Sequence, residues 1–229
     1  MRREVHEGGV FVPRPKTPYM LADGTKVPGV TTVIGQLGWN KQQLLIWAHR
    51  EGLAGRDFRD TSGKAADIGT CAHYMVECDV LGVDADLSGF EPDTVEKARP
   101  AFAAWGQWVR GSNCTIVATE AQLVSERFRY GGTLDAVASI GGQLQVLDFK
   151  TSKAVYPDHV IQLAAYQRLW NEAHPAEQLA PGAMLLRIGK DGAFAAHGFT
   201  QEQLDCGWEA FLHARALYDL RKPLEEAAA

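Results

Sequence analysis

Two aspartates on either side of a predicted turn could together bind a divalent cation and act on a phosphodiester. The turn is Gly141-Gly142, a dipeptide typical of two-residue hairpins, and segments of alternating apolar residues flank it. If these glycines form the loop, Ile140 pairs with Gln143, and every later pair is fixed in the same way. Asp135 then lies directly across from Asp148, on the same face of the two strands.

A lysine follows the second aspartate on the same strand. Lys150 lies two residues beyond Asp148, so we expect it to project from the same face, opposite Thr133. Directly opposed carboxylates have Cβ atoms only about 4.5–5.5 Å apart and repel each other. Either one of them is protonated or both share a cation, and a divalent metal with oxygen ligands removes the repulsion.

This constellation suits hydrolysis of a phosphodiester without a covalent nucleophile. A divalent metal lowers the pKa of a bound water, while Lys150 orients that water and offsets the charge that develops at phosphorus. The alternative is that Asp135 is a solvated strand residue and that Asp148 and Lys150 form a surface ion pair, because the Asp-x-Lys tripeptide is common. The tripeptide alone favours the surface ion pair. With the predicted register, the metal site and the surface ion pair are equally well supported.

Hydrophobic periodicity and turn residues predict a mixed α/β (α+β) chain around this hairpin. A Pro- and Gly-rich start with a turn at Asp23-Gly24 precedes helices at 41–53 and 62–81. A third helix is expected to start near Glu91-Pro92-Asp93, with Asp93 or Thr94 as its cap, and to run to about Val109. Strands are predicted at 115–125, 129–140 and 143–150, followed by a helix at 157–173, a hairpin of 183–189 and 193–199 around Lys190-Asp191-Gly192, a helix from Gln201 to about Arg221, and a frayed tail at 225–229.

The composition is that of an ordinary globular protein. With 229 residues, 46% of them hydrophobic and 22% charged, the chain can bury a substantial core, and disordered and collagen-like classes are excluded. No apolar run approaches the roughly 20 residues of a membrane helix, and the first residues lack the apolar stretch of a secretory signal. Four cysteines without a CxxC pair favour reduced thiols, so we expect a cytoplasmic protein of a bacterial or phage-infected cell.

The net charge of −5 is unevenly distributed along the chain. Residues 77–96 hold seven acidic side chains and no Lys or Arg, so the rest of the chain carries a net charge of +2. The first fifty residues hold seven Lys and Arg against three acidic residues. A basic surface that faces a phosphate backbone is therefore compatible with the composition, although such charge runs more often mark a solvated face.

Motifs along the chain resemble those of the PD-(D/E)XK nuclease superfamily, and most closely its RecB-like exonuclease branch. The resemblance covers about residues 27–170, with the motifs in the order used by that branch. They are Val27-Pro28-Gly29-Val30-Thr31-Thr32-Val33-Ile34, which resembles the opening of phage-encoded and mitochondrial genome-maintenance members, the GTxxHxxxE pattern within 68–77, Glu120, Gly132-Thr133-Leu134-Asp135, Asp148-Phe149-Lys150-Thr151-Ser152-Lys153 and Gln162-Leu163-Ala164-Ala165-Tyr166. Gly29 stands where serine is usual in the opening motif.

The resemblance implies a restriction-endonuclease-like core, in which a central, mainly antiparallel or mixed sheet is flanked by helices. It also implies a Mg²⁺ or Mn²⁺ cofactor and DNA as the substrate. The residues that it implies for the site are His73, Asp135, Asp148 and the backbone carbonyl of Phe149 as metal ligands, Lys150 as the catalytic lysine, Glu120 as an acidic auxiliary, and Gln162 and Tyr166 along the DNA channel.

Helical spacing supports part of this assignment. His73 and Glu77 are four residues apart on one predicted helix, so both can face the same cavity, and neutral imidazole is a competent metal ligand. Gly69 lies one turn earlier, where the missing side chain would let the helix approach the sheet. Without the motif, a lone helical histidine is more often a hydrogen-bonded packing residue.

A later predicted helix carries a polar stripe that could contact DNA. Gln162 and Tyr166 are four residues apart, and His159 extends their stripe by one turn. The alternative is a tyrosine at the margin of the core beside a solvated glutamine. Weaker candidates for phosphate contacts are Thr151, Lys153, Arg127 and Arg129, and Trp39 or Trp47 could stack an unpaired base, although exposed basic side chains usually bind nothing in particular.

We therefore expect a divalent-metal-dependent DNA exonuclease that acts on linear DNA in phage or prophage recombination, replication or repair. A non-catalytic DNA-end binding module and a metallo-hydrolase for small phosphoesters are the alternatives. The sequence allows a homo-oligomer, and a single-strand annealing or recombination protein as partner. It does not determine whether one or two metals act, which DNA strands are preferred, or from which end the DNA is degraded. No membrane partner is expected.

The whole chain is expected to form a single nuclease domain. It would comprise a helical, DNA-contacting part at 1–60, a catalytic core at 61–199, and a C-terminal helix and tail at 200–229. No iron–sulfur cluster is expected. The related nucleases that bind such a cluster have three of their cysteine ligands close together near the C-terminus, and here only Cys206 lies late in the chain.

Overall fold

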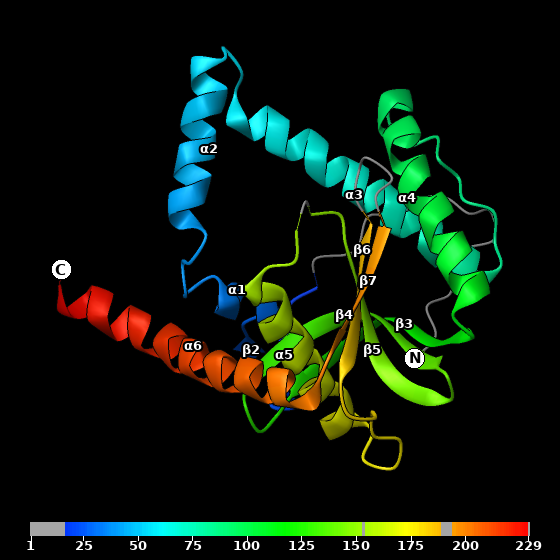
Figure 1. Cartoon of the computed structure of the whole chain (residues 1–229). Helices are drawn as coiled ribbons and strands as arrows, with labels where there is room; N and C mark the ends of the chain where they lie inside the picture. Colours follow the sequence, from blue (N-terminus) through cyan, green and yellow to red (C-terminus); the bar gives the residue numbers. More distant parts are fainter. Residues whose placement is uncertain (1–16, 153, 189–193, 229) are drawn as a thin grey trace.

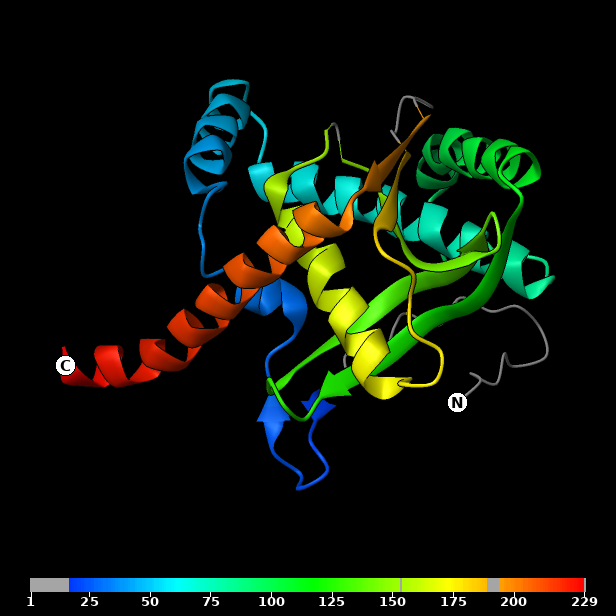
Figure 2. The ribbon, with the colours of Figure 1, turned by 60° about the horizontal axis from the view of Figure 1, so that its bottom comes forward.

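A five-stranded sheet with helices on both faces forms the body of the protein (Figure 1, Figure 2). The structure, a computed structural model, describes residues 17–152, 154–188 and 194–228. In chain order its elements are β1 (Tyr19–Met20), β2 (Lys26–Val27), α1 (Val30–Ile34), α2 (Lys41–Leu53), α3 (Phe58–Leu81), α4 (Pro92–Gly111), β3 (Cys114–Ser125), β4 (Tyr130–Ile140), β5 (Gln143–Lys150), α5 (Pro157–Ala173), β6 (Ala183–Ile188), β7 (Phe194–Phe199) and α6 (Gln201–Ala227). No helix within the described ranges is long and apolar enough to cross a membrane.

The sheet has the strand order β3-β4-β5-β6-β7 and is mixed. β3, β4 and β5 form an antiparallel meander, β6 and β7 pair antiparallel, and β5 runs parallel to β6. Parallel neighbours need a crossover of a dozen or more residues, and the 17-residue α5 supplies it. A mixed sheet flanked by helices confirms the predicted fold class.

The predicted turn and register between β4 and β5 are confirmed. The glycines of Gly141-Gly142 have φ values of +59° and +84°, and a two-residue type I′ turn requires such positive angles at both positions. The antiparallel ladder that starts at this turn ends with Ala136 paired to Leu147. Asp135 and Asp148 are the next residues along the two strands.

Beyond that last pair the two strands separate. The ladder does not reach Lys150, so the expected pairing of Lys150 with Thr133 is wrong. The physical reason is local, because the N–H of Phe149, beyond the last ladder pair, donates a hydrogen bond of 3.0 Å to Oδ2 of the Asp135 side chain. A side chain thus takes the place of a ladder bond where the site begins.

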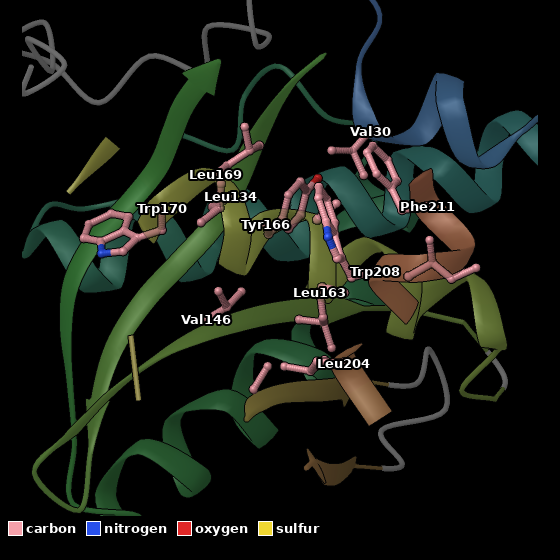
Figure 3. Packing of buried hydrophobic residues seen from close by; sticks show 14 of the residues in the cluster. Val30, Leu134, Val146, Leu163, Tyr166, Leu169, Trp170, Leu204, Trp208 and Phe211 are labelled. Carbon is pink, nitrogen blue, oxygen red and sulfur yellow. The ribbon is translucent and has the colours of Figure 1, made fainter. Parts of the chain in front are cut away.

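Alternate strand residues enter two separate hydrophobic cores. Val137 and Val146 face α5 and α6, and Ala136 and Leu147 face α3 and α4, as the two-residue period of a strand requires. We call these the α5-side core and the α3-side core. The α5-side core also contains Val30, Leu134, Leu163, Tyr166, Leu169, Trp170, Leu204, Trp208 and Phe211 (Figure 3). The α3-side core also contains Cys71, Met75, Ala98, Trp105 and Phe149.

An N-terminal hairpin that the sequence did not predict as strands lies against β4. β1 and β2 pair around the predicted turn at Asp23-Gly24, where the glycine has a φ of +81°. The hairpin is joined to β4 by a hydrogen bond of 3.0 Å from the N–H of Gly131 to the carbonyl of Pro28. The ring of Tyr19 covers Gly131, where a Cβ atom would lie 2.3 Å from Tyr19 Cγ.

The substitution Gly131→Ala should therefore lower the free energy of unfolding by about 1–3 kcal/mol, because the added methyl group must displace the Tyr19 ring. Urea denaturation measures the effect. Gly52→Ala in α2 is the control, since no atom lies within 4 Å of its added Cβ, and it should be neutral or slightly stabilising. Equal stabilities of the two variants would contradict the account of this contact.

The start of α3 and the cap of α4 differ from the prediction, while α4 begins where it was expected. α3 begins at Phe58 and not at Ser62, because the Asp57 side chain caps it by accepting a hydrogen bond of 2.8 Å from the N–H of Arg59. α4 begins at Pro92, with Glu91 at the N-cap position, so the expected caps Asp93 and Thr94 are wrong. Proline suits the first helical position, because the N–H that it lacks would be unsatisfied there.

α6 is longer than predicted, and the expected frayed tail is helical to Ala227. Ion pairs four residues apart, Arg221 with Glu225 and Lys222 with Glu226, support this last part of the helix. The helices predicted at 41–53 and 157–173 match α2 and α5 in full. β6 and β7 pair antiparallel as predicted, and the turn expected around Lys190-Asp191-Gly192 lies outside the described residues.

Candidate active site

Two buried carboxylates lie together where β4 and β5 separate. Asp148 is 1% exposed and Asp135 is 9% exposed, so both have left bulk water. Asp135 approaches β5 closely enough to accept the N–H of Phe149, and its carboxylate acts directly on that of Asp148. The predicted juxtaposition of the two aspartates is thus present, although they lie just beyond the last ladder pair.

Lys150 binds the deeper of the two carboxylates. Its Nζ atom lies 2.5 Å from Oδ2 of Asp148, and its side chain is 20% exposed, so it also reaches solvent. Oδ1 of Asp148 accepts no hydrogen bond from any described residue. A buried carboxylate oxygen without a donor is costly, and this oxygen is therefore available to a cation.

Without a bound cation, it is unfavourable for Asp135 and Asp148 to be ionised at the same time. Burial raises the pKa of Asp148, and the neighbouring Asp135 raises it further, while the ammonium group of Lys150 lowers it. Lys150 alone does not compensate for burial and repulsion. A second positive charge at the pair would stabilise both carboxylates in their ionised form.

The donors fit an oxygen-preferring cation such as Mg²⁺. Within the described residues, no group of three or more His, Cys, Asp or Glu side chains is arranged to hold a metal ion. Mg²⁺ does not need such a cage, because it keeps several waters and is usually bound through one or two carboxylates. Asp135 and Asp148 supply that number.

Glu120 of β3 stands level with Asp135 and has a strained backbone. It lies between the pairs of Thr119 with Ala136 and Ala121 with Leu134, and its φ is +49°. For a residue other than glycine, this left-handed conformation costs roughly 1–2 kcal/mol and concentrates at functional sites. Three acidic residues on neighbouring strands are thus brought to one level of the sheet.

A small pocket on the α3 side joins Glu120 to the predicted histidine helix. His73 and Glu77 both line it together with Glu120 and Asp135, which confirms that the spacing of four residues directs both α3 side chains into one cavity. The ring of His73 meets that of Phe149 edge to face, with the centroids 5.8 Å apart. His73 therefore lies beside the acidic pair, without forming a ready three-ligand cluster with it.

α3 approaches the sheet where the sequence predicted it. A Cβ atom on Gly69 would lie 2.9 Å from Oγ1 of Thr151, so only glycine allows the helix to pass so close to the end of β5. Thr151, expected to contact phosphates, therefore lies directly beneath α3. Its contact with DNA stays a prediction.

The polar stripe of α5 lies near enough to the acidic pair for the charges of Asp148 and Asp135 to act on Tyr166. The side-chain amide of Gln162 donates a hydrogen bond of 2.8 Å to the hydroxyl of Tyr166. Tyr166 is buried, and its pKa is raised by burial first and then by the negative charges of Asp148 and Asp135. Tyr166 is thus a buried residue near the carboxylates, and Gln162 is half-buried and lies nearer the surface.

Tyr19 reaches the site from the N-terminal hairpin, and the sequence reading missed it. Its hydroxyl lies 3.0 Å from Oγ1 of Thr133, two residues before Asp135. The available signal was the pair Gly131-Gly132 inside a strand, since glycine there often marks the close approach of another group.

Arg127 and Arg129, two of the predicted basic residues, make their contacts away from the acidic pair. Arg127 stacks its guanidinium over Phe128, and the carbonyl of Arg129 accepts a hydrogen bond of 3.1 Å from Arg215 of α6. Arg129 precedes Asp135 by six residues, on the order of 20 Å along an extended strand. Lys153 lies outside the described residues. Trp39 is exposed, and Trp47 packs edge to face on Phe58.

His159 should make the stability of the metal-free protein depend on pH. Burial, and then the charge of Lys150, lowers its pKa from 6.5 to about 4. The unfolded chain therefore binds a proton between these two values and the folded chain does not, so stability should fall as the pH falls through this window. Between pH 6.5 and about 4, urea unfolding in EDTA should show that the wild type loses on the order of 1 kcal/mol more free energy of unfolding than His159→Gln does. This figure allows for the partial exposure of the ring. Identical pH profiles of the two proteins would contradict this.

The chain is similar to known nucleases. A family model for the PD-(D/E)XK nuclease superfamily matches residues 45–226. The Mus musculus protein "Mitochondrial genome maintenance exonuclease 1" is 28% identical over 189 residues, which make up 78% of this chain and 54% of that protein. The chain thus spans about half the length of this curated relative. The solved structure "Crystal Structure of LHK-Exo in complex with dAMP" aligns with 11% identity and a TM-score of 0.33, over 72% of this chain and 92% of that one.

Proposed function

The chain belongs to the PD-(D/E)XK nuclease superfamily, and on that premise we propose that it is a divalent-metal-dependent exonuclease that hydrolyses phosphodiester bonds of linear DNA. The observation that carries the proposal is the buried pair of Asp135 and Asp148, with Lys150 Nζ 2.5 Å from one oxygen of the pair. A cationic amine and two carboxylates in need of a cation are the groups that metal-assisted phosphodiester hydrolysis requires.

Asp135, Asp148 and the carbonyl of Phe149 would hold the metal through oxygen atoms, and His73 would be a further ligand from α3. When bound, Mg²⁺ or Mn²⁺ neutralises charge on the phosphate and lowers the pKa of a water molecule to make it a better nucleophile. The oxygen donors suit a hard cation, since Mg²⁺ and Mn²⁺ prefer carboxylate and carbonyl ligands.

Lys150 would orient the attacking water and offset the charge that develops on the phosphate. Its ion pair with Asp148 fixes the amine, so little reorganisation is needed during the reaction. Glu120 and Glu77, which line the pocket beside Asp135, would serve as acidic auxiliaries. Gln162 would contact the DNA strand from the α5 side.

The exonuclease activity named for the mouse relative supports this proposal over a non-catalytic DNA-end binding module, because the acidic pair and the lysine are all present here. We further propose that residues 1–229 form one nuclease domain. A role in recombination, replication or repair in a bacterial or phage-infected cell, with an annealing or recombination protein as partner, is part of the same proposal.

End-labelled single-stranded and double-stranded DNA, linear and circular, tests the activity. With Mg²⁺ or Mn²⁺ we expect mononucleotides from linear DNA only, and no product in EDTA. The label that is released first gives the polarity. Binding of DNA ends without cleavage would favour the binding module, and cleavage of a mononucleotide ester but not of DNA would favour a small-molecule phosphoesterase. Cleavage of circles would contradict exonuclease action.

A further inference from the structure

His159 lies on α5, within electrostatic range of the lysine of the proposed mechanism. It shares one helical face with Gln162 and Tyr166, three and seven residues further along. The positive charge of Lys150 acts on the His159 ring, while those of Asp148 and Asp135 act on Tyr166. The stripe therefore runs across the site, with His159 at the end near the lysine.

A local hydrogen bond fixes which ring nitrogen of His159 carries the proton. The N–H of Tyr156 donates to Nδ1 of His159 over 3.2 Å, at the start of α5. A nitrogen that accepts a hydrogen bond carries no proton, so the neutral ring must be protonated at Nε2. Burial and Lys150 hold the pKa near 4, and the ring is therefore neutral at pH 7.

The Nε2 donor is not used inside the described part of the protein. Among the described residues, the His159 side chain makes a hydrogen bond only with the N–H of Tyr156, through Nδ1. Nε2 has no hydrogen-bond partner among these residues. The ring is only partly buried, so Nε2 can meet a ligand. A neutral donor near a cation is suited to bind an anionic oxygen. Lys150 would balance the negative charge of the ligand, and the N–H group would orient the oxygen through a directional hydrogen bond.

We propose that Nε2–H of His159 donates a hydrogen bond to a non-bridging phosphate oxygen of the DNA strand held beside Lys150. The inference rests on the proposed nuclease function and deepens it by assigning a further DNA-binding residue. Because the donor is neutral, it releases no counterion, so its loss should weaken binding without changing the dependence of affinity on salt.

The chain offers a matched control for the capping role of His159. In α6, the side chain of Gln203 accepts a hydrogen bond of 2.9 Å from the N–H of Thr200, at the same helical position as His159 in α5. His159→Ala and Gln203→Ala each delete one capping acceptor and should lower Tm by similar amounts. His159→Gln supplies an amide that can cap the helix and still donate.

DNA binding is measured with linear DNA in Ca²⁺ over a range of salt concentrations, and cleavage in Mg²⁺. We expect His159→Ala to weaken binding about tenfold at every salt concentration, with a parallel loss in cleavage. Gln203→Ala should bind and cleave like the wild type, and His159→Gln should recover most of the lost affinity.

Three results would overturn the inference while leaving the nuclease proposal intact. They are wild-type binding by His159→Ala, equal losses in His159→Ala and Gln203→Ala, and a salt slope reduced by about 0.7 or more, which would indicate a cationic contact. A wild-type protein that neither binds nor cleaves linear DNA would instead overturn the proposed function itself.

Discussion

The substitution Asp148→Asn should reduce DNA cleavage by at least about 10³-fold and leave the folded protein at least as stable as the wild type. Asparagine has the size of aspartate but not its charge, so one of the two carboxylates for the cation is lost. The fixed partner of Lys150 is lost in the same step. The measurement is the single-turnover rate on end-labelled DNA in saturating Mg²⁺.

The stability of this variant separates a functional from a structural role of Asp148. Because burial raises the pKa of Asp148, ionising it costs folding free energy, and its contribution to stability declines as the pH rises from the ordinary pKa of 3.8 towards the raised pKa of the folded protein. Asparagine removes this cost, so Tm at pH 8 in EDTA should be equal or higher. Retention of cleavage by this variant would contradict its assignment, and a much lower Tm would contradict the electrostatic account.

The substitution Lys150→Ala should lower cleavage by about 10²–10³-fold and, unlike Asp148→Asn, should also destabilise the protein. Removal of the amine leaves Asp148 buried beside Asp135 without its counter-ion. We expect a loss of about 1–3 kcal/mol in the free energy of unfolding, limited by protonation of the carboxylate. Single-turnover kinetics and urea unfolding measure the two effects.

Lys150→Arg distinguishes the charge from the position of the amine. A guanidinium keeps the positive charge beside Asp148, so stability should return close to the wild-type value. Its planar donors lie elsewhere than the single Nζ atom, so cleavage should stay at least about tenfold below wild type. Full recovery of cleavage would show that the position of Nζ is not important.

The central hairpin was predictable because its determinants are local. Gly141-Gly142 accepts positive φ at both positions, and the alternating apolar residues then fix the register as far as the last pair before the two aspartates. The expected pairing of Lys150 failed for a reason that no local pattern contains. The Asp135 side chain replaces a ladder bond at Phe149, and the sheet opens there.

Other parts of the site depend on contacts between distant segments. The spacing of His73 and Glu77 predicted a shared cavity, and Gly69 predicted a close helix, because both features are visible on one helix. The strained φ of Glu120 and the contact of Tyr19 with β4 arise only when strands far apart in the chain have paired.

Titration calorimetry with Mn²⁺ in the absence of DNA tests most directly whether Asp135 and Asp148 share a cation. The wild type should bind Mn²⁺, and Asp148→Asn should bind it at least about tenfold more weakly, because one carboxylate ligand is lost. Asp219→Asn on the exposed part of α6 is the control and should bind like the wild type. Equal Mn²⁺ affinities of the wild type and Asp148→Asn would contradict the shared cation site.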